Sequence, residues 1–184
     1  MPSTLHTPDA VLAFWFDEIA PKQWWTRSDA FDQHIAARFG ALLQAAARCE
    51  LDGWRTSANG RLAEIIVLDQ FSRNIHRHHA QAYVCDPLAL ALAQTAVAIN
   101  ADRELEPERR AFLYMPYMHS ESRVIHTTAL ALFSAPGMEA NLNSAIRHKA
   151  IIDRFGRYPH RNATLGRAST PEEIAFLQTP GSSF

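Results

Sequence analysis

The stretch Arg61-Leu-Ala-Glu-Ile-Ile-Val-Leu-Asp-Gln-Phe-Ser-Arg-Asn74 decides the fold class of this chain. Leu62, Ile65 and Ile66 recur at helical spacing, and Asp69 and Arg73 continue the same stripe. A stripe of this kind lies on one face of an α-helix and packs against a core. We therefore expect the carboxylate of Asp69 at a buried position, where it needs a hydrogen-bonding or charged partner.

Helical spacing continues through the rest of the chain, and no strand-like alternation bounded by turns interrupts it. Four prolines stand where first helical turns are expected, at Pro8, Pro87, Pro107 and Pro171. These patterns predict an all-α protein with seven or eight helices in a single domain, residues 1–184. Because proline lacks a backbone donor, the helix that begins near Glu106 is expected to kink or end at Pro116.

Composition and charge restrict the classes of partner and the cell compartment. The 184 residues are 47% apolar, enough for a substantial core, and the net charge of −1 argues against a general nucleic-acid binder. Two cysteines without CxxC spacing suit a reducing compartment. The N-terminus lacks the basic region of a signal peptide, and the longest apolar run, residues 87–99, is too short to cross a membrane. We therefore expect a cytoplasmic protein with neither nucleic acid nor membrane as a partner.

An arginine-rich segment follows the last long helix. Residues 154–170, Arg154-Phe-Gly-Arg-Tyr-Pro-His-Arg-Asn-Ala-Thr-Leu-Gly-Arg-Ala-Ser-Thr170, hold Arg154, Arg157, His160, Arg161 and Arg167, and no acid. Gly156 can end the preceding helix, and Thr170-Pro-Glu-Glu173 has the pattern of a capping box that starts another. Since the net charge is nearly zero, the acids that balance these arginines must lie elsewhere on the protein or on a ligand.

Two further groups of polar residues interrupt apolar surroundings. Gln70 and Asn74 lie beside Asp69 on its helix, and His119 and Glu121 follow Pro116 in Tyr114-Met-Pro-Tyr-Met-His-Ser-Glu121. An i,i+4 ion pair between Asp69 and Arg73 would explain the helix residues without any ligand. We expect His119 and Glu121 to face an interior cavity rather than bulk solvent.

Three motifs resemble those of the bacterial and plant domain-of-unknown-function family nine-two-four. They are Leu68-Asp-Gln-Phe-Ser-Arg-Asn-Ile-His-Arg77, Phe112-Leu-Tyr-Met-Pro-Tyr-Met-His-Ser-Glu121, and Arg154-Phe-Gly-Arg-Tyr-Pro-His-Arg-Asn162 with Leu165-Gly-Arg167. The resemblance covers nearly the whole chain. It implies a compact, right-handed stack of antiparallel helix pairs of the tetratricopeptide-like superfamily, and it implies no activity.

If the three motifs meet in space, they form a polar cleft, and a binding function is the first hypothesis. Guanidinium groups bind carboxylate or phosphate with two parallel hydrogen bonds, so the ligand would be an anionic small molecule or an acidic peptide. Neither a cofactor nor a metal ion is expected. The candidate ligand-binding residues are Asp69, Gln70, Arg73, Asn74, His119, Glu121, Arg157, His160, Arg161 and Arg167.

An enzyme of the hydrolase or isomerase type is the second hypothesis. His119 or His160 would act as general base, and Glu121 or Asp69 would orient it. No nucleophile elbow, phosphate loop or HExxH motif selects a reaction. A metal site from His76, His119, Glu121 and His160 lacks a dense ligand motif.

A structural ion network is the third hypothesis. Arg157 and Arg161 would then pair with Asp69 or Glu121 and lock the arginine-rich segment onto the helices. The adjacent tryptophans Trp24 and Trp25 pose a similar choice, because they either pack over a helix junction or stack on a ligand.

Overall fold

A computed structural model describes residues 7–183 of the chain, and every regular element in that range is helical. The π-helical turn Val67–Phe71 joins α3 to α4 without a break, so the α segments make up eight helices in the described range, in agreement with the sequence prediction. The segments are α1 (Pro8–Ala13), α2 (Asp29–Ala47), α3 (Ala58–Ile66), α4 (Ser72–Ile75), α5 (Asp86–Ala98), α6 (Pro107–His119), α7 (Arg123–Phe133), α8 (Glu139–Phe155) and α9 (Pro171–Leu177).

The helix starts follow the local sequence signals. A proline occupies the first turn of α1, α5, α6 and α9, as the sequence predicts. The side chain of Ser28 accepts from a backbone N–H at the start of α2, and Thr170 with Glu173 forms a complete capping box on α9. These side chains satisfy backbone donors that have no partner within the helix.

Of the two outcomes expected at Pro116, a kink or the end of the helix, the second is wrong. Helix α6 continues through Pro116 to His119, and all residues from Ala111 to Met118 are buried. An internal proline costs a helix about 3 kcal/mol or more. The burial of this whole turn between neighbouring helices offsets that cost, and the continued helix carries His119 to the end of α6.

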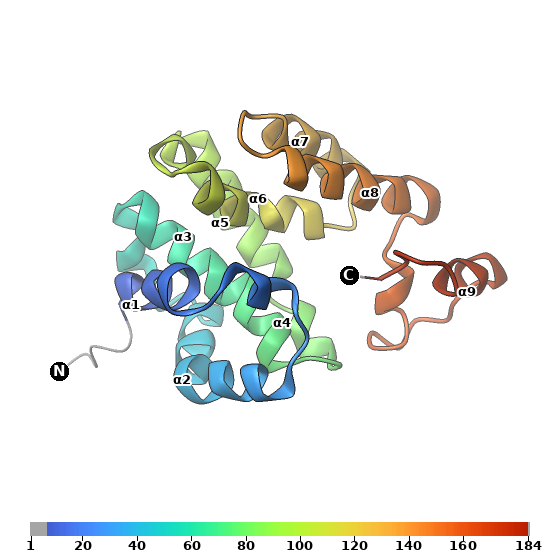
Figure 1. The fold of residues 1–184 in the computed structure, drawn as a ribbon, viewed down its shortest axis with the longest axis horizontal. Helices are drawn as coiled ribbons and strands as arrows, with labels where there is room; N and C mark the ends of the chain where they lie inside the picture. The colour runs from blue at the N-terminus through green and yellow to red at the C-terminus, as the bar shows by residue number, and fades with distance from the viewer. Residues whose placement is uncertain (1–6, 184) are drawn as a thin grey trace.

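Neighbouring helices pack against one another in chain order over the second half of the fold. Helix α5 packs on α6, α6 on α7, and α7 on α8, while α1 packs on α3 and α2 packs on α4 and the π-helical turn. Figure 1 shows α7 and α8 together along one edge of the molecule, with α9 beyond the end of α8. Fully buried aromatic rings, Phe14, Trp15, Phe39 and Phe71, fill the centre of the main core.

The C-terminal segment has a small apolar cluster of its own. Ile151, Ile152 and Tyr158 are buried, and Phe155 and Phe176 pack against them. The hydroxyl of Tyr158 donates a 2.6 Å hydrogen bond to the carbonyl of Met118 on α6. This bond holds the arginine-rich segment against the end of α6, where the candidate site lies.

None of the helices in the described range is both long enough and apolar enough to cross a membrane.

Candidate functional site

A cavity of about 490 Å³ opens where η5 (Ala80–Tyr83), the first turns of α5, the end of α6 and the arginine-rich segment meet. We call it the His119 pocket. Apolar side chains form much of its wall, among them Val84, Pro87, Leu90 and Leu165. Its polar lining residues include Tyr83, Asp86, His119, Glu121 and Arg161. Two of the three sequence motifs therefore contribute polar side chains to one cavity.

The third motif reaches the pocket through Asp69, which lies directly behind His119. Asp69 is fully buried, and its Oδ1 lies 2.8 Å from Nδ1 of His119 and 3.1 Å from the guanidinium of Arg73. Gln70 donates a 2.6 Å hydrogen bond to the other carboxylate oxygen. The prediction that Asp69 is buried is confirmed, and the i,i+4 pair with Arg73 that was considered as an alternative explanation is present. The buried carboxylate therefore has the partners that its burial requires.

Two pKa shifts fix the protonation state of this pair. Burial alone would raise the pKa of Asp69, but the charge of Arg73 and the contact with His119 hold it well below its usual range. Burial lowers the pKa of His119, with Arg73 acting in the same direction and Asp69 opposing. At neutral pH, Asp69 is therefore ionised and His119 neutral. An ionised carboxylate only accepts hydrogen bonds, so Nδ1 carries the proton and Nε2 keeps its lone pair.

Asp86 connects two arginines at the edge of the pocket. Its Oδ2 accepts from Arg73 at 3.0 Å and from Arg161 at 3.3 Å. The guanidinium of Arg161 lies 4.6 Å from the ring centroids of both Tyr83 and Tyr158, and it also donates to the carbonyl of His119 at 3.0 Å. Arg161 is thereby fixed by ring faces and hydrogen bonds, and it holds the backbone that carries His119.

Glu121 has a different role from His119 although the two are close in sequence. It accepts two hydrogen bonds from Arg167, at 2.7 and 3.0 Å, and one from the backbone N–H of Tyr158 at 2.8 Å. Burial would raise its pKa, but these hydrogen bonds lower it. Both His119 and Glu121 line the pocket, as expected. The carboxylate of Glu121, however, is occupied by its hydrogen bonds to the arginine-rich segment, which it holds in place.

Arg157 is paired differently from the expectation. It contacts neither Asp69 nor Glu121, and instead makes hydrogen bonds of 2.7 and 2.8 Å to Glu173 in the capping box of α9. The Arg157 hydrogen bond lowers the pKa of Glu173 to about 2. Arg154 likewise pairs with Glu172. The acids that balance these two arginines lie 18 and 16 residues further along the chain, at the start of the next helix. They meet the arginines because the segment turns back on itself.

Asn74 and His160 contact residues other than the pair formed by Asp69 and His119. Asn74 donates to Asp32 on α2 at 2.7 Å, and Arg77 pairs with the same carboxylate. The ring of His160 lies 5.5 Å from that of Tyr158, and burial lowers its pKa to about 4. Neither residue is among those that line the pocket. Within residues 7–183, no three His, Cys, Asp or Glu side chains are grouped as a metal site requires, so the set of His76, His119, Glu121 and His160 does not assemble.

Sequence reasoning missed Tyr83 and Asp86, which line the pocket, and Tyr158, which packs on Arg161. Asp86 has the ordinary sequence signature of a first helical turn, so its role as the acceptor for Arg73 and Arg161 is not visible. The excess of arginines was a usable signal, because it required acids elsewhere on the chain. Tyr158 lies inside the arginine-rich motif, but only the fold shows that its ring packs on Arg161.

Comparisons with known proteins give a family but no activity. The sequence model of a family described as "Bacterial protein of unknown function (DUF924)" matches residues 11–181. Among solved structures, a protein of unknown function from Agrobacterium tumefaciens is 38% identical, with a TM-score of 0.88, and the match covers 93% of this chain and 96% of that one. Among curated proteins, none matches the chain.

Proposed function

Since the chain belongs to the bacterial family DUF924, whose function is unknown, we propose a function from its own residues: general acid–base catalysis by His119 on a small, uncharged substrate. One observation carries the proposal. Asp69 holds Nδ1 of His119 at 2.8 Å, while His119 lines a cavity and its Nε2 makes no hydrogen bond within the described residues. A buried carboxylate that fixes the tautomer of a histidine is the arrangement that prepares the far nitrogen to take up a proton.

The proton-transfer chemistry follows from the charge states. Nε2 of neutral His119 accepts a proton from a substrate C–H or O–H group, or from a water that attacks the substrate, and the ring becomes an imidazolium. The ionised Asp69, in contact with Nδ1, stabilises that positive charge as it forms. The proton then returns from Nε2 to the product. Isomerisation and hydrolysis both use this sequence.

The charges around the pocket favour an uncharged substrate. Asp69 and Asp86 balance Arg73 and Arg161, and Glu121 is neutralised by Arg167. Neutral His119 adds no charge. A charged substrate would lose hydration on entering this largely apolar cavity without meeting a surplus of opposite charge. A small neutral ester or carbonyl compound loses less hydration free energy on entering the cavity.

Binding of an anion by the arginine-rich segment has less support. Four arginines of the segment each have an acidic partner: Arg154 with Glu172, Arg157 with Glu173, Arg161 with Asp86 and Arg167 with Glu121. An anion would have to displace a carboxylate that is already in place. These contacts support the structural-network hypothesis for the segment and leave His119 as the reactive group.

The test is a panel of small neutral esters and ketones, with hydrolysis followed by chromophore release and proton abstraction by deuterium uptake from heavy water. The wild type is compared with His119→Gln, which keeps a polar side chain of similar reach. His79→Gln is the matched control, because His79 is exposed and is not one of the lining residues of the pocket. Loss of a general base typically lowers a rate by about a hundredfold or more.

We expect His119→Gln to lose the activity and His79→Gln to keep it, with circular dichroism confirming that both fold. The rate of the wild type should fall as pH decreases and Nε2 becomes protonated. Equal rates for wild type and His119→Gln on every active member of the panel, or no active member, would contradict the proposal.

A further inference from the structure

A second hollow, of about 640 Å³, lies over the first half of α6. It is bounded by the 3-10 turn η2 (Pro21–Trp25) and by residues around the start of α8, including Gly137 and Ala140. We call it the Trp25 groove. Its α6 residues Ala111, Phe112 and Met115 differ from those that line the His119 pocket, so the two hollows use different surfaces of one helix.

The two tryptophans of the groove are held in different ways. The indole N–H of Trp24 donates a 2.8 Å hydrogen bond to the carbonyl of Trp15, and its ring meets Phe112 edge-on at 4.9 Å. Packing over a helix junction is therefore confirmed for Trp24. Trp25 stacks nearly parallel to Phe112, at 11° and 6.1 Å, yet it is 63% exposed.

Trp24 and Trp25 form an aromatic corner. Their ring planes meet at 87° with centroids 6.3 Å apart, and both rings border the groove. Because the two ring planes are perpendicular, a ligand in the groove would meet a π-face or a ring edge from two directions. The hydrogen bond of Trp24 and the stacking of Trp25 on Phe112 fix this geometry before any ligand binds, so ligand binding does not have to order the rings.

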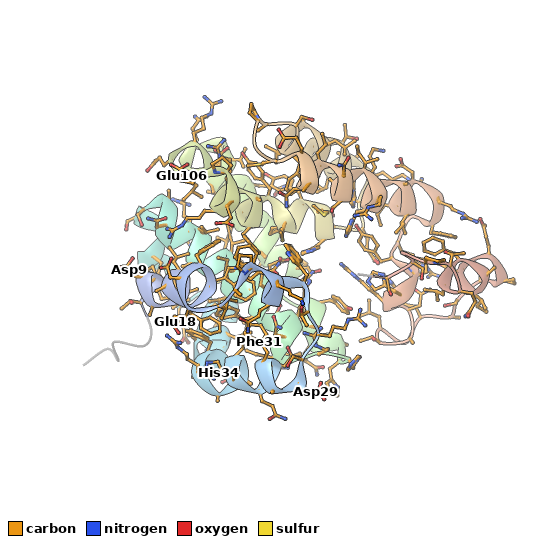
Figure 2. The ribbon with its side chains drawn as sticks, in the orientation of Figure 1. Asp9, Glu18, Asp29, Phe31, His34 and Glu106 are labelled. Carbon is orange, nitrogen blue, oxygen red and sulfur yellow. The ribbon has the colours of Figure 1, made fainter. Side chains whose placement is uncertain are left out.

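The charges of the groove are all of one sign. Glu106 and Glu108 are its charged lining residues, both are exposed, and neither takes part in an ion pair within residues 7–183. Figure 2 shows Glu106 at the periphery of the molecule. Acids in the first turn complement the dipole of α6, which accounts for their presence there. It does not account for an exposed tryptophan held against the same hollow.

We propose that the Trp25 groove binds a small molecule that carries an alkylammonium group. Ring faces attract an organic cation through their quadrupole, and a trimethylammonium or similar head presents both the charge and the apolar methyl surface that such rings favour. Glu106 and Glu108 would supply the balancing negative charge. An anion would be repelled by these acids, and an uncharged apolar ligand would gain nothing from them. The proposal does not depend on the role of His119.

The test compares choline with its neutral carbon isostere, in which a tert-butyl group replaces trimethylammonium. Both are titrated into the full chain by calorimetry and by NMR detection of the tryptophan indole resonances. Because cation–π attraction strengthens binding about 2- to 30-fold, choline should bind more tightly than the isostere by a factor in that range. The choline signal should also weaken as salt is added.

Two variants assign the binding to the groove. Trp25→Leu keeps apolar bulk but removes the π-face, and Glu106→Gln with Glu108→Gln removes the charge. Each should weaken choline binding about twofold or more. The matched control is Asp9→Asn, a first-turn acid on α1 outside the groove, which should bind choline as the wild type does. Thermal unfolding verifies that every variant is folded.

Several results would overturn the proposal. One is the absence of saturable choline binding with a Kd below about 10 mM. Another is equal binding of choline and the neutral isostere, which would make the groove merely apolar. Choline binding that Trp25→Leu leaves unchanged would place the site elsewhere. Binding of a lysine- or arginine-rich peptide without binding of choline would point to a protein partner instead.

Discussion

Asp69→Asn is the substitution that probes the buried centre of the site most directly. It keeps the shape of the side chain but removes the charge that contacts Arg73 at 3.1 Å and Nδ1 of His119 at 2.8 Å. Breaking a buried ion pair usually costs about 3–5 kcal/mol. Arg73 keeps Asp86 at 3.0 Å and the carbonyl of residue 69 at 2.6 Å, so its charge is not left alone.

We therefore expect the lower end of that range, about 3 kcal/mol of unfolding free energy, or a fall in Tm of about 6–12 °C for a chain of this size. Urea unfolding measures the first quantity and calorimetry the second. The matched control is Asp153→Asn, which removes an exposed i,i+4 pair with Lys149. Pairs of that kind contribute only about 0.3–0.5 kcal/mol.

The same variant tests the tautomer of His119. Asparagine can donate to Nδ1, which moves the ring proton to Nε2 and removes the lone pair that the proposed base requires. Nitrogen-15 NMR of the imidazole distinguishes the two tautomers. The reasoning fails if Asp69→Asn is no less stable than Asp153→Asn, or if the proton of His119 stays on Nδ1.

Three other expectations follow from the described contacts. Burial lowers the pKa of His148 to about 3, so between about pH 6.5 and 3 the unfolded chain binds a proton that the folded chain does not. The free energy of unfolding should therefore fall with decreasing pH, by up to about 1.4 kcal/mol per pH unit. A free energy of unfolding in urea that stays constant from about pH 7 to 5 would contradict this. Gly60→Ala should destabilise the folded protein by about 1–3 kcal/mol despite the better helix propensity of alanine, because the new Cβ would lie 1.9 Å from the carbonyl oxygen of Trp54. The control is Gly40→Ala, whose Cβ would meet nothing within 4 Å. Thermal unfolding should show this control to be neutral or stabilising. Glu173→Gln should reduce the hydrogen-exchange protection of α9, since the carboxylate accepts hydrogen bonds from Arg157 and from the backbone N–H of Thr170. Phosphate or citrate should leave the Tm of the wild type unchanged. A clear rise in Tm with either anion would restore the anion-binding hypothesis.

The local structure could be predicted from the sequence because its causes are local. The apolar spacing around Asp69 sets the buried face of its helix, and proline and capping residues set where helices begin. The burial of Asp69 followed from the same spacing. Pro116 shows where local rules fail, since the cost of an internal proline is offset by packing against other helices, which the local pattern does not contain.

The partners of the buried charges could not be predicted in this way. Asp69 meets His119 across 50 residues of sequence, and Asp86 meets Arg161 across 75. Helical periodicity says which side of a helix a residue occupies but not which helix will face it. The single-domain organisation and the cytoplasmic location stay predictions.

The arginine-rich segment was the most conspicuous functional signal in the sequence. Its contacts explain why it does not support an anion-binding site. An acid-free run of arginines required acids elsewhere, either on the chain or on a ligand. Glu172 and Glu173, which directly follow the segment, supply two of them, and Asp86 and Glu121 supply the others. A guanidinium already paired with a carboxylate gains little from binding an anion, because the anion would replace an existing partner. It can still donate hydrogen bonds that hold the protein backbone in place. What the segment positions is the end of α6, through the bonds from Arg161 to the carbonyl of His119 and from Tyr158 to that of Met118. The side chain left with a reactive atom at that end is His119, whose pKa is lowered by burial and whose ring is oriented by the carboxylate of Asp69.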